Sequence, residues 1–319
     1  MINKRDLMLL GAAAFTNTFA IKAMAQPAGY PQRPVRVVVA SGPGGASDVM
    51  ARTFQRSLDK ASPHPMVVQN MPGGGTSIGA REIALADPDG HHMLMMHEGV
   101  ISAAAQGIFQ PGMSGLTSVA STGRDVYSVV VHAASPYATL GDLIAAAKRG
   151  NIRTSVNIGG LNHMTSLIVA DAGGVSFRPV QTGSGADSVR SVLGKQTDVI
   201  FTVPSDVTSY VASGDMRILA VLDEKRSPFA PNVPTAAEAG FPAVSRLTHM
   251  WWMPKGTPTD RIAWMESKLK AAMSDPAVVE SLKSRMIDAV FMPGADMDRY
   301  VEATNRKMDD FVKRFNLKQ

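Results

Sequence analysis

Residues 35–48 read VRVVVASGPGGASD. The β-branched run at 35–39 is bounded by Pro34 and Gly42, which is typical of a buried strand. Beyond the glycine-rich turn, apolar residues recur at helical spacing over 49–58. A strand, a glycine turn and a helix in this order indicate the first part of a βαβ unit, and therefore an α/β fold.

The same order of elements follows at once, with a strand at 66–69, a second glycine turn (PGGGTS) at 72–77 and a helix at 78–86. Strands and helices then alternate along the chain, which extends the α/β prediction to most of it. We expect further strands at 93–96, 129–131, 153–158, 177–180, 198–203 and 216–221, and further helices at 140–148, 164–172, 186–193, 260–274, 277–284 and 296–315.

The first 25 residues predict a secretory signal peptide. Lys4 and Arg5 form a basic start, an apolar stretch follows at 7–20, and Ala23-Met24-Ala25 matches an A-x-A cleavage site. The apolar stretch is shorter than the roughly 20 residues that a membrane-spanning helix needs. We therefore expect cleavage after residue 25 and a mature protein in the periplasm.

Composition excludes several classes of protein. The 319 residues contain no cysteine, so disulfides, thiolate metal sites and a cysteine nucleophile are excluded. The formal charge is +5, but no basic run with interleaved aromatic residues is present, and a nucleic-acid partner is not expected. With 45% hydrophobic residues, the chain is long enough to bury the core of two domains.

Both glycine turns stand where a strand gives way to a helix. There the helix presents unpaired N–H groups and the positive end of its dipole, and glycine lets a ligand approach the backbone. Such a junction holds an anion without a cationic side chain. The candidate ligand-binding residues of the two turns are Pro43, Gly44, Gly45, Ser47, Asp48, Gly74, Gly75, Thr76 and Ser77. We expect a bulky residue at Gly74 to abolish binding and to leave the fold intact.

Tight backbone geometry alone is the other interpretation of these turns. Two such turns at one sheet edge favour the anion site, since ligands usually bind at the carboxyl ends of strands in an open α/β sheet. A nucleotide-phosphate loop is not favoured, because neither turn ends in Gly-Lys-Ser/Thr and Ser47 occupies the last glycine position of G-x-G-x-x-G.

Short motifs in a fixed order cover nearly the whole mature chain. They include Arg33-Pro34-Val35-Arg36, Gly42-Pro43-Gly44-Gly45, Pro72-Gly73-Gly74-Gly75, Pro88-Asp89-Gly90, Arg217-Ile218-Leu219-Ala220-Val221, Val233-Pro234-Thr235 and Pro254-Lys255-Gly256-Thr257-Pro258. In this combination the chain resembles the substrate-binding receptors of tripartite tricarboxylate transporters, the Bug family.

The resemblance implies a type II periplasmic-binding-protein fold (Venus flytrap), with two lobes that each contain a mixed sheet flanked by helices. Lobe 1 is expected to comprise residues 27–128 and 249–319, and lobe 2 residues 129–248. The first-lobe glycine loops are expected to hold one carboxylate of a small organic ligand. Closure of the lobes would then present the loaded receptor to membrane transporter subunits.

Lobe 2 is expected to contact the other end of the ligand. Residues 159–163 replace a serine- and glycine-rich loop of the family, and residues 181–184 resemble its Tyr-Lys-Gly-Ser without the tyrosine. Because the chain departs from the family here, the ligand is left open between a dicarboxylate and an aromatic carboxylate. The candidate residues are Gly160, Asn162, His163, Gln181, Thr182, Gly183 and Thr202.

Three single residues have two interpretations each. Asp48 either caps a helix or shapes the ligand site. His163 either donates a hydrogen bond to a carboxylate or serves as a capping or packing residue. Glu98 either faces the ligand, which would then carry an amine or a hydroxyl, or is a solvated loop carboxylate.

The predicted function is that of a monomeric solute receptor and not of an enzyme. No G-x-S-x-G elbow is present and no base pairs with a serine. No cofactor and no metal are expected, since His91 and His92 are neighbours whose side chains point apart. A ligand sensor that signals to a membrane kinase is the alternative function.

Overall fold

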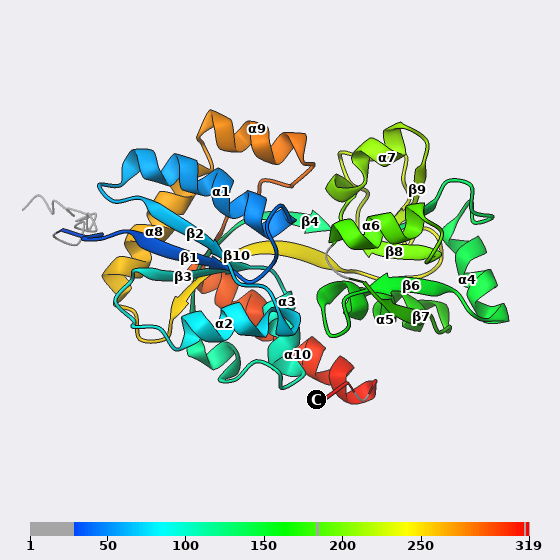
Figure 1. Ribbon diagram of the computed structural model, residues 1–319, viewed down its shortest axis with the longest axis horizontal. Helices are drawn as coiled ribbons and strands as arrows, with labels where there is room; N and C mark the ends of the chain where they lie inside the picture. The colour runs from blue at the N-terminus through cyan, green and yellow to red at the C-terminus, as the bar shows by residue number, and fades with distance from the viewer. Residues whose placement is uncertain (1–28, 183–184, 316, 319) are drawn as a thin grey trace, which may run out of the picture.

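The computed structural model describes residues 29–182, 185–315 and 317–318. The predicted signal peptide at 1–25 and the candidate residue Gly183 lie outside these described residues. Two β-sheets lie side by side, each covered by helices on both faces (Figure 1). This arrangement confirms the predicted α/β class.

The first sheet has six strands in the order β11-β4-β10-β3-β1-β2. The chain forms its parallel part first, because β1 pairs with both β2 and β3 in parallel register, whereas β10 runs antiparallel to β3 and β4. The strands are β1 (Val35–Val39), β2 (Met66–Asn70), β3 (His92–Met96), β4 (Leu116–Val126), β10 (Arg246–Pro254) and β11 (Met292–Pro293).

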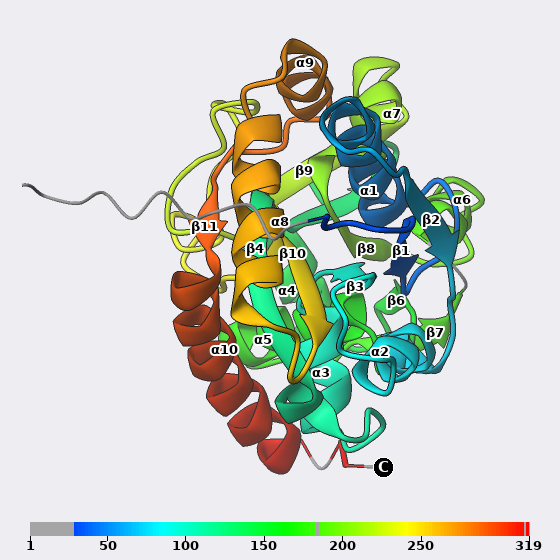
Figure 2. The same cartoon turned by 90° about the vertical axis from the view of Figure 1, so that its left-hand side faces the viewer.

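Helices cover the first sheet on both faces (Figure 1, Figure 2). One face carries α1 (Ala46–Leu58), α8 (Thr259–Ala272) and α9 (Pro276–Ser284). The other carries α2 (Ser77–Ala84), α3 (Gly99–Ala105) and α10 (Gly294–Arg314). Because both faces of the sheet are buried, its neighbouring strands β1 and β3 are largely apolar and do not alternate between apolar and polar residues.

The second sheet has five strands in the order β7-β6-β8-β5-β9. Its strands are β5 (Ser128–His132), β6 (Arg153–Val156), β7 (Arg178–Gln181), β8 (Val199–Thr202) and β9 (Met216–Val221). Its helices are α4 (Leu140–Arg149), α5 (Leu161–Gly173), α6 (Gly185–Leu193) and α7 (Thr208–Ala212). They form separate cores on the two faces of the sheet.

The chain passes between the sheets at Tyr127, which separates β4 from β5, and returns before β10. Backbone hydrogen bonds join these crossings: Tyr127 N–H donates to Ser245 O at 3.0 Å, and Leu222 N–H donates to Tyr127 O at 2.7 Å. The sheets therefore divide the strands near the lobe boundaries expected from the sequence, whose positions stay a prediction.

The last helix, α10, contacts both halves of the molecule. Met297 and Val301 pack in the core of the first sheet, whereas Val312 packs against Met164 of α5. Near its end, Arg314 forms an ion pair with Asp171. Figure 1 shows the helix running from beneath the first sheet toward the second. The helix is therefore a second physical link between the two sheets, besides the crossing strands.

Every strand and helix expected from the sequence is present, within a few residues of the expected bounds. Five helices and strands were missed: the short helices α3 and α7, the long strands β4 and β10, and the two-residue strand β11. Among the described residues, no helix combines the length and apolarity that crossing a membrane requires.

Candidate functional site

A cavity of about 680 Å³ lies between the two sheets. Its walls are the segments that directly follow β1, β2 and β3 on one side and β6 and β8 on the other, together with the first turns of α5 and α6. These are carboxyl ends of parallel strands, where open α/β sheets usually bind ligands.

Three helices begin at this cavity without a side-chain cap. The N-cap residues are Gly45 for α1, Thr76 for α2 and Gly160 for α5, and none of them accepts a capping hydrogen bond through its side chain. All three line the cavity. Their first N–H groups and dipole ends therefore give the cavity a positive potential that comes from the backbone.

Hydroxyl groups add to this surface. The side-chain oxygens of Ser41, Ser47 and Thr76 are buried at the cavity wall and have no hydrogen-bond partner among the described residues. Thr76 also has a φ of +85°, which is an unusual conformation for a β-branched residue and typical of functional sites. The wall from the first sheet thus offers hydrogen-bond donors that the protein itself does not use.

Asp48 fixes the first glycine loop from behind. Its carboxylate accepts hydrogen bonds from Gly44 N–H at 2.9 Å, from Arg52 Nε at 3.0 Å and from Asn70 Nδ2 at 3.0 Å. Burial opposes ionisation, but these hydrogen bonds hold the pKa of Asp48 below its usual value. Asp48 does not line the cavity, so its observed contacts are those of a residue that shapes the loop.

The other candidate residues of the two turns differ in whether they line the cavity. Pro43, Gly44, Gly45, Ser47, Gly74, Gly75 and Thr76 line the cavity, whereas Ser77 is buried behind it. On the opposite wall, Gly160, Asn162 and Thr202 line the cavity. Whether any of these residues contacts a ligand stays a prediction.

Three of the lobe 2 candidates hold the loop at 157–160 by its backbone. Asn162 Oδ1 accepts from Asn157 N–H at 3.1 Å, Gln181 Oε1 from Ile158 N–H at 2.8 Å, and His163 Nδ1 from Gly159 N–H at 3.3 Å. Burial lowers the pKa of His163, so its ring is neutral and able to accept. Because His163 and Gln181 do not line the cavity, they act on it through this loop.

Thr182 also lies behind the lobe 2 wall and supports it without lining the cavity. Its hydroxyl lies 2.8 Å from that of Ser155 and 2.9 Å from that of Ser188. Of these three residues only Ser188 lines the cavity. The hydroxyl cluster therefore ties the end of β7 to the first turns of α6.

Glu98 has neither of the positions considered from the sequence. It is only 2% exposed and does not line the cavity, so the solvated-loop interpretation is wrong. Its carboxylate accepts from Thr248 N–H at 2.9 Å and from Tyr300 Oη at 2.5 Å. Burial raises the pKa of Glu98, although these hydrogen bonds act in the opposite direction. Glu98 therefore joins α3 to β10 and α10.

Several residues that line the cavity were not identified from the sequence. The polar ones are Ser41, His97, Tyr127, Asn157, Ser188, Arg190, Asp206 and Tyr210, and the larger apolar ones are Met96, Leu161, Phe201 and Leu247. His97 directly follows the strand predicted at 93–96, and this position is a signal that strand-end reasoning had available. The others depend on how distant segments meet.

His97 is a neutral donor at the end of β3. Its Nδ1 accepts from Gly99 N–H at 3.0 Å, and this hydrogen bond assigns the ring proton to Nε2. Burial, with a smaller effect of His249, lowers the pKa of His97 to about 3. In the unfolded chain His97 takes up a proton near pH 6.5, whereas in the folded chain it does so only near pH 3. The contribution of neutral His97 to the free energy of unfolding is therefore complete above pH 6.5 and is lost as the pH falls toward 3.

We therefore expect acid to destabilise the wild type more than His97→Asn, which cannot titrate. Between pH 6.5 and 4.5 the extra loss in the free energy of unfolding should be about 2–3 kcal/mol. Urea unfolding at a series of pH values measures it, with His64→Asn, a partly exposed histidine outside the cavity, as the control. Parallel pH profiles for wild type and His97→Asn would contradict a neutral, partly buried His97.

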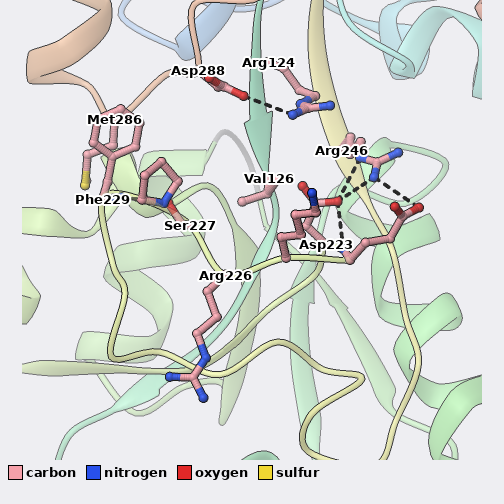
Figure 3. A pocket seen from close by; sticks show the side chains of 12 residues that line it. Arg124, Val126, Asp223, Arg226, Ser227, Phe229, Arg246, Met286 and Asp288 are labelled. Atoms are coloured by element: carbon pink, nitrogen blue, oxygen red, sulfur yellow. Dashed lines mark hydrogen bonds and ion pairs between the residues drawn. The ribbon is translucent and has the colours of Figure 1, made fainter.

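A second cavity, of about 330 Å³, lies near the crossing strands (Figure 3). Its arginines are already paired: Arg124 with Asp288 at 3.0 Å, and Arg246 with Asp223 at 2.5 Å. Figure 3 shows these guanidinium groups directed at the carboxylates. Since the guanidinium groups of Arg124 and Arg246 are already paired with carboxylates, this cavity is a weaker candidate for an anion than the cavity between the sheets.

Comparison with known proteins gives consistent matches. A family model described as "Tripartite tricarboxylate transporter family receptor" matches residues 50–317. Protein BugT of Bordetella pertussis is 30% identical over 282 residues, which cover 85% of this chain and 86% of BugT. The solved periplasmic binding protein BugD has a TM-score of 0.82 at 25% identity and covers 91% of this chain and 99% of its own. An R. palustris protein solved with adipate has a TM-score of 0.81 at 24% identity, covering 89% of this chain and 97% of its own. These likenesses confirm the predicted resemblance and the periplasmic-binding-protein fold.

Proposed function

Because the chain belongs to the family of tripartite tricarboxylate transporter receptors, we propose that it captures a small organic carboxylate in the cavity between its sheets and delivers it to a membrane transporter. The observation that carries the proposal is the convergence of three uncapped helix N-termini on one cavity. The unpartnered hydroxyls of Ser41, Ser47 and Thr76 lie at the same wall. Such a surface suits an anion.

The donors are sufficient in number for useful affinity. One helix terminus contributes about 0.3–1 kcal/mol, or about 2 when partly buried. A hydrogen bond to a charged group contributes about 1.5–3 kcal/mol. Two termini with three or four such hydrogen bonds can supply the roughly 8 kcal/mol of micromolar binding, and desolvation and ordering subtract part of that sum.

Transport requires that capture change the shape of the receptor. We propose lobe 1 as residues 27–128 and 249–319 and lobe 2 as residues 129–248, with hinge motion at the crossings near Tyr127 and Ser245. The cavity walls come from both lobes, so a ligand that touches both favours the closed arrangement. Export to the periplasm, after loss of residues 1–25, is part of the same proposal.

Titration calorimetry against a panel of carboxylates tests the proposal. At least one carboxylate should bind with a dissociation constant of about micromolar, and its methyl ester, which lacks the negative charge, should bind about a hundredfold more weakly. Sugars and neutral peptides are the control ligands. Binding of a control ligand without binding of any carboxylate would overturn the ligand class.

A further inference from the structure

Asp206 is the one acidic residue among the described residues that line the cavity. Its counterpart in charge, Arg190, also lines the cavity but forms an ion pair with Asp187 one turn earlier on α6. Asp206 forms no ion pair with any described residue. The cavity therefore contains one carboxylate whose charge no neighbouring side chain neutralises directly.

The position of Asp206 is well defined. It ends the 3₁₀ turn Pro204–Asp206 that follows β8, and Thr202 Oγ1 donates a hydrogen bond of 2.6 Å to its Oδ2. Its Oδ1 accepts no hydrogen bond within the described part of the chain. Asp206 is exposed although it stands between the sheets, so its open side faces the cavity.

The electrostatic surroundings favour a positive partner. Desolvation by the surrounding protein raises the pKa of Asp206; the hydrogen bond from Thr202 lowers it, the charge of Asp125 raises it and the charge of Arg285 lowers it. Burial and the charge of Asp206 also raise the pKa of Tyr127, another residue of the cavity wall. A ligand cation would be attracted by the charge of Asp206, whereas a second ligand carboxylate would be repelled by it.

The first sheet offers N–H groups, hydroxyls and His97 Nε2–H, all of which can donate hydrogen bonds. The opposite wall also has donors, at the N-terminus of α5 and at Arg190, but in addition it carries Asp206, the one carboxylate among the described residues of the cavity. We propose that Asp206 selects carboxylates that carry a protonated amine at the end distant from the carboxylate, so that the ligand is a zwitterion and not a dicarboxylate. This inference rests on the proposed carboxylate-binding function.

The test uses linear carboxylates of four, five and six carbons that end in an amine, a hydroxyl, a carboxylate or a methyl group, together with the matching alkylamines. Calorimetry on the mature protein at neutral pH should give the amine-terminated acid about tenfold or more preference over the dicarboxylate of the same length. Asp206→Asn should reduce that ratio by at least about tenfold. Asp215→Asn, an exposed aspartate that also accepts from a hydroxyl but does not line the cavity, should leave it unchanged.

The possible outcomes distinguish a failure of the selection by Asp206 from a failure of the proposed carboxylate-binding function. A dicarboxylate that binds the wild type as tightly as the amine-terminated acid at every length overturns the selection by Asp206 and leaves the carboxylate function standing. A preference for the hydroxyl-terminated acid over the amine also overturns it, since Asp206 would then act as a neutral hydrogen-bonding group. Absence of binding by every acid overturns the proposed function as well. The wild-type ratios decide these points even if Asp206→Asn fails to fold.

Discussion

Gly45→Leu is expected to reduce carboxylate affinity by about a hundredfold or more, at a cost of only about 1 kcal/mol in folding stability. Gly45 is the N-cap of α1 and lines the cavity with an ordinary φ of −74°. A Cβ there would meet only Gly42 O, at 3.5 Å. The leucine side chain therefore occupies the space beside the first N–H groups of α1, where a carboxylate would otherwise lie, and calorimetry with the best ligand of the panel measures the loss.

The matched control is Gly141→Leu. Gly141 lies in the first turn of α4, outside the cavity, and a Cβ there meets Thr139 Oγ1 at 3.5 Å. This variant should bind as the wild type does, and thermal melting should show both variants folded. Wild-type affinity in a folded Gly45→Leu would show that the anion does not use the α1 terminus.

Gly74, which the sequence suggested for this experiment, does not give as clean a test. Its φ is +54°, and an added Cβ would lie 2.4 Å from Ser77 Oγ. A bulky residue would strain the loop itself, so the expectation that the rest of the structure stays intact does not hold at this position. Loss of binding in such a variant would not distinguish a blocked approach from a distorted loop.

Strands that contain a run of β-branched residues were predictable from the sequence. β1 has four valines in five residues, and β5 has three in succession, so each was evident as a strand. β4 (LTSVASTGRDV) and β10 (RLTHMWWMP) have neither a β-branched run nor alternation. Helices bury both faces of these strands, and their length and pairing are set by tertiary contacts, so periodicity alone could not identify them.

The two walls of the candidate site differ in the same way in how far the sequence predicts them. The first wall was predictable because glycines and hydroxyls mark the strand-to-helix junctions in the sequence itself. On the second wall, the backbone at 157–160 is held by side chains from as far along the chain as Gln181. Asp206 reaches the cavity only because its 3₁₀ turn lies opposite the glycine loops. Such meetings of distant segments leave no short motif.

Asp125→Ala is expected to lower the free energy of unfolding by about 3–5 kcal/mol, as removal of one member of a buried pair does. His249 Nε2 lies 3.1 Å from Asp125 Oδ2, and the two side chains are 0% and 1% exposed. The backbone partner of Asp125 on β10 is Leu247, and His249 lies two residues further along, where the pairing of β10 with β4 shifts register between Thr248 and Met250. Burial raises the pKa of Asp125, and His249 acts in the opposite direction. Urea unfolding at neutral pH measures the change.

Two further variants separate the missing partner from the missing volume. Asp125→Asn keeps a hydrogen-bonding group beside His249 and should cost about 1 kcal/mol. Asp125→Val combined with His249→Leu removes both polar groups and should come closer to wild type than Asp125→Ala does, because no polar group is left buried without a partner. A double variant as unstable as Asp125→Ala would instead assign the loss to packing.

The strands β4 and β10 carry the chain between the sheets, so calorimetry on the double variant also tests whether this pair influences closure. If ligand affinity changes while stability does not, the pair influences closure.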